Sequence, residues 1–307
     1  MSTWLWIVII LLIVAVGVMV GIAVKVGLTL IRPPRKPIEM DPARYGLPHY
    51  ENVIFPSRDA DLQLSGWYMD AEWHGYPSNG HTIVVSHGYR QNRQEPHLPA
   101  LALVTHLVAA GFDVLMYDFR NAGESEGNMT SIGLYEQLDL RGAIDFACIK
   151  KPGHRIGLIG FSMGSVTSLL VAGQDERVEA VVADSPFYSL YEYLQENMPV
   201  WTGLPSFPFT WLILSIVPFL VGASPRKVRP IDEVKRFSPK PILFIHGTGD
   251  KAIPHHHSEK LYEAAANPHN EVFLVEGADH VRSFARQPKE YSERVITFFQ
   301  EKMVGKA

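Results

Sequence analysis

The first stretch of the chain is apolar at almost every position, whereas the rest alternates apolar and polar residues in short segments. Residues 4–24 carry no charged side chain and consist mostly of Ile, Leu, Val, Ala, Met and Gly. At about 1.5 Å per residue, a helix of this length crosses the roughly 30 Å hydrocarbon core of a bilayer. The pattern therefore predicts a transmembrane anchor within residues 1–31.

A cleaved signal peptide and a buried core helix are the alternatives for this segment. A signal peptide starts with basic residues and has a shorter apolar core before a small-residue cleavage site, and this sequence has none of these features. A core helix is rarely so uniformly apolar. Basic residues follow the segment at positions 25, 32, 35 and 36, and none precedes it. The positive-inside rule thus predicts a single-pass membrane protein whose remaining part lies in the cytoplasm.

Residues 32–48 form a proline-rich segment, with prolines at positions 33, 34, 37, 42 and 48. Proline lacks the backbone N–H that a helix needs, so this density excludes helix and predicts an extended linker. The change of pattern after it indicates that one domain occupies residues 49–307.

Strand-like and helix-like patterns alternate through that domain. An antiparallel pair is expected at residues 52–55 and 62–69, with a turn around residues 58–60. Further strands are expected at 82–86, 112–117, 155–160, 178–183, 242–246 and 271–275, and helices at 98–110, 133–146, 163–172, 257–266 and 288–302. This alternation predicts an α/β fold, in which helices cover both faces of a mostly parallel sheet.

Composition narrows the functional classes. The 307 residues are 47% hydrophobic and 20% charged, which is typical of a globular chain. A net charge of -4 gives no basic footprint, so nucleic acid is not expected as a partner. The single cysteine, Cys148, excludes an intrachain disulfide and is expected to be a small buried apolar residue.

The clearest chemical motif is Gly160-Phe161-Ser162-Met163-Gly164. It follows an expected strand and opens an expected helix of small residues. A serine in this context sits on a sharp strand-to-helix turn, and the flanking glycines let the backbone pack tightly. The alternative is an ordinary turn with a capping serine. The motif predicts that Ser162 is a nucleophile.

Two further residues follow in the chain order that such a nucleophile requires. Asp250 lies on a loop after the strand expected at 242–246, and His280 follows the strand expected at 271–275. Active sites of parallel sheets gather beyond the carboxyl ends of the strands. An imidazole removes the serine proton, and a carboxylate fixes the imidazole tautomer. Asp279, next to His280, is the competing acid, but side chains of neighbouring residues usually diverge in a turn.

Several short motifs together resemble the α/β-hydrolase superfamily, and within it the bacterial membrane-anchored hydrolases and the Bem46-like group. The resembling stretches are residues 86–89, 117–120, 123–125, 160–164, 246–250 and 277–280. The resemblance implies Ser162 as nucleophile, Asp250 as acid and His280 as base. It also implies an oxyanion hole formed by the backbone N–H groups of Tyr89 and Met163. Relatives usually carry glycine where this chain has Asn121.

Other polar residues are expected to have structural roles. His87 belongs to the turn before Tyr89, and Asp118 and Arg120 are expected to hold the loop around Gly123. The run at positions 255–257 is three histidines, but without nearby Cys or spaced carboxylates it favours a solvated helix start over a metal site. No metal or other cofactor is therefore expected.

The insertion at about residues 186–238 is charge-free from residue 197 to residue 224. Prolines at 199, 205, 208 and 218 are expected to break up its helices, which argues against a second transmembrane span. The resemblance implies a lid over the active site. Its apolar residues, Trp201, Trp211 and Leu214 among them, are expected either to pack on the core, or to line an acyl-binding pocket or dip into the bilayer.

These features predict a serine hydrolase that cleaves carboxyl ester or thioester bonds of apolar or lipid-like acyl substrates through an acyl-enzyme. Two alternatives stay open. One is a peptidase of the same fold, which would recognise a peptide terminus by acidic residues or a narrow slot. The other is a noncatalytic membrane-bound scaffold, against which the ordered Ser, Asp and His argue.

Overall fold

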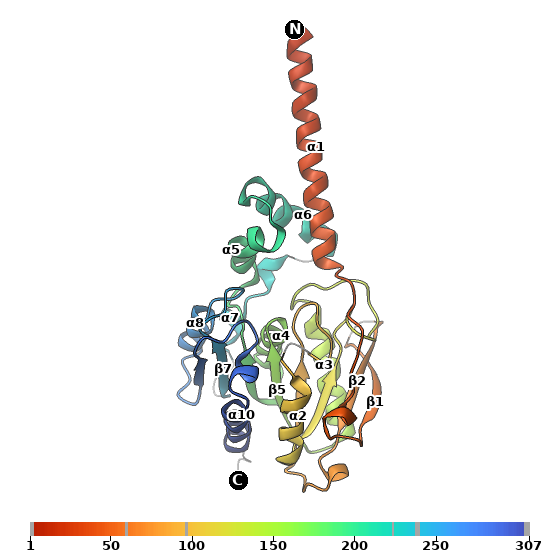
Figure 1. Ribbon diagram of the computed structural model, residues 1–307, viewed down its shortest axis with the longest axis vertical. Helices are drawn as coiled ribbons and strands as arrows, with labels where there is room; N and C mark the ends of the chain where they lie inside the picture. The colour runs from red at the N-terminus through yellow and green to blue at the C-terminus, as the bar shows by residue number, and fades with distance from the viewer. Residues whose placement is uncertain (1–2, 59–60, 96–97, 223, 237–239, 304–307) are drawn as a thin grey trace.

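A computed structural model describes residues 3–58, 61–95, 98–222, 224–236 and 240–303 of the chain. Its first helix, α1 (Thr3–Ile31), projects from the rest of the molecule (Figure 1). Residues 3–22 of α1 are largely exposed, and at about 1.5 Å per residue they cover about 30 Å. Within the described ranges, α1 is the one unbroken helix long and apolar enough to cross a membrane. Residues 1 and 2 of the expected anchor lie outside those ranges.

The proline-rich segment after α1 lies against the domain and contains a short 3-10 helix, η1 (Pro42–Tyr45). Asp41 caps the start of η1, and Gly46, with a φ of 84°, ends it. Proline suits the first position of a helix, where its missing N–H would have no partner. Arg35 donates hydrogen bonds to the backbone carbonyls of residues 123, 125 and 127. The expectation of a helix-free extended segment was therefore wrong for residues 42–45.

An eight-stranded sheet forms the centre of the described domain, in the order β1-β2-β4-β3-β5-β6-β7-β8. Its strands are β1 (Glu51–Pro56), β2 (Gln63–Met69), β3 (His81–Ser86), β4 (Asp113–Tyr117), β5 (Arg155–Phe161), β6 (Val178–Asp184), β7 (Ile242–Gly247) and β8 (Glu271–Val275). The β1–β2 and β2–β4 pairs are antiparallel, and the other pairs are parallel. The predicted fold class is confirmed. Of the expected first turn, residues 59 and 60 lie outside the described ranges.

Helices cover both faces of this sheet. One core cluster joins the sheet to α2 (Ala100–Ala109) and α10 (Pro288–Lys302). The other joins it to α3 (Glu136–Lys150), α4 (Met163–Ala172) and α8 (His256–Ala265). α3 begins later than expected because the Glu136 carboxylate accepts hydrogen bonds from the amides of Ser131 and Gly133, which holds these residues in a loop.

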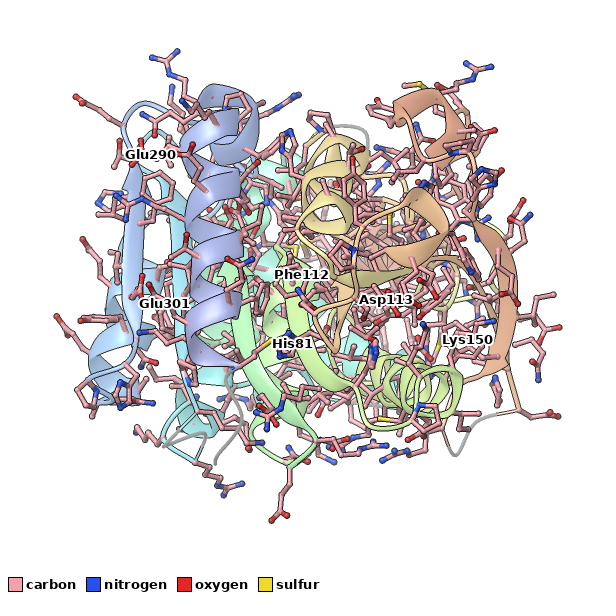
Figure 2. The ribbon with its side chains drawn as sticks, turned by 90° about the horizontal axis from the view of Figure 1, so that it is seen from below. His81, Phe112, Asp113, Lys150, Glu290 and Glu301 are labelled. Atoms are coloured by element: carbon pink, nitrogen blue, oxygen red, sulfur yellow. The ribbon has the colours of Figure 1, made fainter. Side chains whose placement is uncertain are left out.

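The parallel strands begin at one end of the sheet and finish at the other. Figure 2 views the end away from α1, where His81 and Asp113 mark the starts of β3 and β4. The carboxyl ends of the parallel strands therefore point toward α1. This is the end at which α/β sheets place their ligands.

The insertion between β6 and β7 forms α5 (Leu190–Thr202), η3 (Ser206–Thr210), α6 (Trp211–Val221), η4 (Pro225–Lys227) and α7 (Pro230–Glu233). Figure 1 shows α5 and α6 beside the base of α1. The chain bends by 115° between α5 and η3–α6, so this apolar stretch is not a straight second span. Of the expected range, residues 223, 237 and 238 lie outside the described residues.

The insertion is broken as expected, but two of the four prolines expected to break its helices do not do so. Pro199 lies inside α5 and Pro218 inside α6. The break falls instead between the two helices, where Gly203 adopts a φ of 68° and Pro205 follows. A residue in this left-handed conformation ends a helix, whereas a proline near a helix end removes only one backbone hydrogen bond.

Candidate active site

Ser162 occupies a strained turn between β5 and α4. Its φ of 51° and ψ of -113° lie outside the regions that non-glycine residues usually adopt. A Cβ atom on Gly160 would lie 2.3 Å from the carbonyl oxygen of Gly164, and one on Gly164 would lie 2.2 Å from that of Ser86. Because backbone atoms cannot yield at such distances, the turn requires glycine at both flanking positions.

The structure brings Ser162, His280 and Asp250 together at the carboxyl ends of β5, β7 and β8. The Nε2 atom of His280 lies 3.0 Å from the Oγ of Ser162, and its Nδ1 lies 2.6 Å from the Oδ2 of Asp250. Asp279, the competing acid, is exposed and accepts a hydrogen bond from the backbone N–H of His280, not from its ring. The side chain that orients the imidazole is therefore that of Asp250.

The Asp250 carboxylate accepts hydrogen bonds at both oxygens. Its Oδ1 accepts from the amides of Ala252 and Ile253, at 2.9 and 2.8 Å. Its Oδ2 faces the imidazoles of His280 and His246, the latter at 3.2 Å. Burial opposes ionisation of this carboxyl group, but the hydrogen bonds from His246 and His280 outweigh it and lower the pKa of Asp250 to about 2. The group is therefore a carboxylate at neutral pH.

His246 is a site residue that the sequence pattern did not reveal. Its Nε2 lies 2.7 Å from the carbonyl oxygen of Ile253, which can only accept, so Nε2 carries the proton. Its Nδ1 then accepts from the Ser258 hydroxyl at 2.7 Å. This buried imidazole thus presents an N–H to Asp250 in a fixed direction. The signals in the sequence are that this histidine stands inside an otherwise apolar strand and begins the resembling stretch 246–250.

Tyr89 and Met163, whose amides are expected to form the oxyanion hole, both belong to segments beside Ser162. Met163 follows the nucleophile directly, and Tyr89 follows Gly88, whose Cα faces the Ser162 side chain: a Cβ there would lie 3.6 Å from the Ser162 Cβ. Within the described residues neither amide donates a hydrogen bond. Both are therefore free to bind an oxygen of a substrate.

The turn before Tyr89 is held by two buried side chains. His87 accepts from the Phe119 amide through Nε2 at 3.0 Å and donates through Nδ1 to the Gly88 carbonyl, the structural role expected for it. Glu95 accepts from the Gly88 amide at 2.6 Å. Burial raises the pKa of Glu95 to about 7. The contact between Glu95 and Gly88 was not foreseen, since no local motif marks it.

Asp118 holds the loop around Gly123 as expected, by accepting from the amides of Arg93 and Glu124. Within the described residues, the Arg120 guanidinium donates no hydrogen bond to that loop. It pairs instead with Asp139 on α3, at 2.7 Å, because a buried carboxylate requires a cationic partner. Asn121 adopts a φ of 58°, which explains why glycine is usual there and why asparagine can replace it.

The histidines at the start of α8 do not all face solvent. His257 is fully buried, stacks on Tyr188 at a centroid distance of 4.7 Å, and accepts from the Tyr188 amide. Burial lowers the pKa of His257 to about 3, so the ring is neutral. The expectation of a solvated turn was wrong here because His257, Ser258 and Leu261 share the core-facing side of α8.

The part of the chain that the structure describes contains no cluster of three or more potential metal ligands. Cys148 is half-buried against the core.

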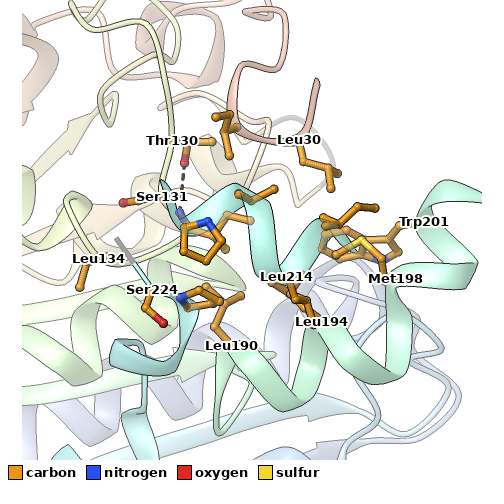
Figure 3. A pocket seen from close by; sticks show the side chains of 16 residues that line it. Leu30, Thr130, Ser131, Leu134, Leu190, Leu194, Met198, Trp201, Leu214 and Ser224 are labelled. Atoms are coloured by element: carbon orange, nitrogen blue, oxygen red, sulfur yellow. Dashed lines mark hydrogen bonds between the residues drawn. The ribbon is translucent and has the colours of Figure 1, made fainter. Parts of the chain in front are cut away.

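An apolar cavity lies between α5, α6 and the end of α1 (Figure 3). Trp201 and Leu214 are in its wall. Trp211 is not, because it points outward from α6 and is 64% exposed. Ser162 does not line the cavity either, but Tyr89 stacks on Trp201 with an interplanar angle of 5°, so the cavity begins next to the expected oxyanion hole.

Comparison with known proteins places this geometry in a family. A family model of the alpha/beta hydrolase fold matches residues 74–213, and one of the prolyl oligopeptidase family matches residues 152–306. Protein YqkD of Bacillus subtilis is 33% identical over 71% of this chain and 70% of its own length. The lysophosphatidylserine lipase ABHD12 of Xenopus tropicalis is 29% identical over 68% of this chain and 52% of its own length. The solved esterase Pf2001 of Pyrococcus furiosus superposes with a TM-score of 0.72 at 28% identity, covering 89% of this chain and 100% of that structure.

Proposed function

Because the chain belongs to the α/β-hydrolase family, we propose that it is a membrane-anchored serine hydrolase that cleaves carboxyl esters or thioesters of apolar acyl groups. The observation that carries the proposal is the hydrogen-bonded series from Ser162 through His280 to Asp250, at 3.0 and 2.6 Å. A nucleophile, a base and an orienting acid at these distances are the arrangement that acyl transfer requires.

The proposed reaction forms and then hydrolyses an acyl-enzyme. The Ser162 oxygen attacks the acyl carbonyl while the Nε2 of His280 takes its proton, and Asp250 stabilises the resulting imidazolium. The amides of Tyr89 and Met163 bind the oxyanion of the tetrahedral intermediate, where losing one donor typically costs about 10²–10³ in rate. His280 then protonates the leaving alcohol or thiol. Water attacks the acyl-enzyme by the same route and releases the acid.

Apolar acyl groups are favoured over peptides by the cavity beside the oxyanion hole. No ionisable side chain is among its lining residues within the described chain. Two of the similar proteins, ABHD12 and Pf2001, are a lipase and an esterase, which supports the same reaction class. The match to the prolyl oligopeptidase family supports a peptidase as the second candidate. Glu192, an acidic residue that such an enzyme would use near the lid, is paired with Arg229 at 3.3 Å.

The proposed domain organisation follows the expected one. Residues 1–31 would anchor the protein, residues 32–48 would connect the anchor to the catalytic domain at 49–307, and residues 186–238 would act as its lid. The exposed apolar face of α1 supports a membrane span. The basic residues that follow it support a cytoplasmic catalytic domain.

Hydrolysis of p-nitrophenyl esters and thioesters of graded acyl length, beside aminoacyl and prolyl p-nitroanilides, tests the proposal on the full chain. We expect ester turnover that falls by at least about 10³ in Ser162→Ala. Ser78→Ala, at the opposite edge of the sheet, is the matched control and should retain full turnover. Cleavage of the anilides without the esters would establish the peptidase. Absence of all turnover and of fluorophosphonate labelling would favour a scaffold.

A further inference from the structure

The last turns of the anchor helix α1 pack against the domain instead of standing clear of it. Its last turns pack along α6, and the residues buried on this side, Ala23, Gly27 and Ile31, recur every fourth position. A Cβ atom on Gly27 would lie 2.6 Å from the Cγ2 of Val217. Glycine at this position therefore lets the anchor and the lid approach closely.

The carboxyl end of α1 is hydrogen-bonded to loops of the active site. The Tyr89 hydroxyl donates to the Leu30 carbonyl at 2.6 Å, and the Thr130 amide donates to the Ile31 carbonyl at 2.8 Å. The last carbonyls of a helix have no partner within the helix, so these bonds satisfy them. They also fix the end of the anchor relative to the residue whose amide we assign to the oxyanion hole.

The side chains of Leu30 and Ile31 form part of the cavity wall. Figure 3 shows Leu30 on one side of the cavity and Leu190 and Leu194 of α5 on the other. The lining residues include no Asp, Glu, Lys, Arg or His within the described chain. A space of this composition suits a hydrocarbon chain.

The side chains of both residues of the proposed oxyanion hole contact residues of the cavity wall. Tyr89 stacks on Trp201 of this wall at a centroid distance of 6.0 Å. The hydroxyl of Thr130, also in the wall, lies 3.7 Å from the sulfur of Met163. An acyl group whose carbonyl sits at Ser162 would therefore send its distal part past Tyr89 and Met163 into the cavity.

The outer side of the same region is strongly apolar. Phe219 of α6 is 87% exposed and Phe207, in the turn before it, is 82% exposed. The exposed apolar residues of α1 begin just beyond the contact between α1 and α6. Exposed patches of this kind mark surfaces that meet a membrane or a partner. Since the exposed part of α1 would continue into the bilayer, the cavity would lie at the membrane surface, where the anchor leaves the bilayer.

We propose that the membrane anchor is itself a wall of the acyl-binding pocket, and that the pocket takes the hydrocarbon chain of an ester dissolved in the same bilayer. The inference rests on the ester hydrolysis proposed above. Each methylene buried in an apolar site contributes about 0.8 kcal/mol, which is about a fourfold gain in kcat/KM. A wall residue of α1 should therefore set how much of a long chain is accommodated.

The test uses the full chain in phosphatidylcholine vesicles and compares kcat/KM for p-nitrophenyl esters of graded acyl length, from acetate to palmitate. Leu30→Trp fills the cavity and should lower the palmitate-to-acetate ratio at least about tenfold, the effect of excluding two methylenes. Leu30→Ala, which removes volume, should instead move the preferred acyl length upward. Val18→Trp, on the exposed part of the same helix, is the matched control and should leave the ratio unchanged.

The outcomes separate this inference from the function on which it rests. If the wild type hydrolyses these esters and both Leu30 variants keep its ratio and its preferred length, the anchor is not part of the pocket. If palmitate ester held in separate, protein-free vesicles is hydrolysed as fast as ester in the same vesicles, the bilayer is not its source. If the wild type hydrolyses none of these esters and takes up no fluorophosphonate, the proposed function fails and the inference fails with it.

Discussion

Replacing Asp250 by asparagine changes one atom and should abolish the function of His280. The carboxylate accepts from N–H groups at both oxygens: the amides of Ala252 and Ile253 at one, and the imidazoles of His246 and His280 at the other. An asparagine side chain has one accepting oxygen and one donating NH₂ group. The NH₂ cannot face two backbone N–H groups, so it must face the imidazoles, one of which has to become an acceptor.

His280 is the imidazole that can adapt, because the Ile253 carbonyl and Ser258 hold the His246 tautomer. Accepting at Nδ1 places the His280 proton on Nε2, which faces Ser162 and can then no longer take the serine proton. In serine protease triads the same substitution and tautomer error lower kcat about 10⁴-fold. We expect a loss of that size, equivalent to about 5 kcal/mol in the activation barrier.

The substitution should also destabilise the fold. The hydrogen bonds hold the pKa of Asp250 at about 2, below its ordinary value of 3.8, so its ionised form favours the folded state. At about 1.4 kcal/mol per pKa unit, the contribution is about 2 kcal/mol. It is fully present above the unfolded pKa, near pH 4, and is lost as the pH falls toward 2. Asp250→Asn should therefore melt lower than the wild type at neutral pH, and this difference should shrink on acidification.

Ester turnover and thermal unfolding of the full chain in detergent measure both effects. Asp279→Asn is the matched control, since its exposed carboxylate contacts only the His280 backbone, and kcat should stay within about twofold of the wild type. The reasoning is refuted if Asp250→Asn keeps kcat within tenfold of the wild type, or if Asp279→Asn causes the larger loss.

Three further predictions concern the turn, the buried acid and the lid. Gly164→Ala places a Cβ atom 2.2 Å from the Ser86 carbonyl oxygen and should lower the free energy of unfolding by about 3 kcal/mol. Gly21→Ala, whose added Cβ meets no atom within 4 Å, is the control and should not lower it. Thermal unfolding of the two variants measures the difference. Burial raises the pKa of Glu95 to about 7, so between about pH 4.5 and 7 this residue binds a proton in the folded state but not in the unfolded state. The free energy of unfolding of the wild type should therefore fall by about 3 kcal/mol as the pH rises through that interval. A flat profile in the wild type, or an equal fall in Glu95→Gln, would contradict this. Leu214→Ser should reduce the preference for long acyl esters while Trp211→Ser, outside the cavity, should not; equal effects would exclude the cavity as the acyl site.

The residues of the expected triad were accessible to sequence analysis because each stands in a local pattern. Ser162 lies between two glycines at a strand-to-helix boundary, and Asp250 and His280 each follow an apolar strand. Since parallel strands deliver their carboxyl ends to one edge of a sheet, local patterns suffice to predict that such residues meet.

The residues that were missed make contacts that depend on the folded shape of a loop and that no sequence motif marks. Glu95 binds the Gly88 amide, and His246 faces Asp250 only after the strand and its loop have folded. Composition could not distinguish Trp201 from Trp211 either. Their orientation is decided by how α6 packs against α1 and by the bend between α5 and α6, which no pattern within the insertion contains.

The most direct test of the account is the site of covalent labelling by a fluorophosphonate, determined by mass spectrometry of the digested full chain. We predict a single adduct on the peptide that contains Ser162, formed in the wild type and absent in Ser162→Ala. Its rate of formation should fall sharply in Asp250→Asn, because His280 can no longer accept the serine proton. An adduct on another residue, or none under conditions in which the protein is folded, would contradict the assignment of Ser162 as the nucleophile.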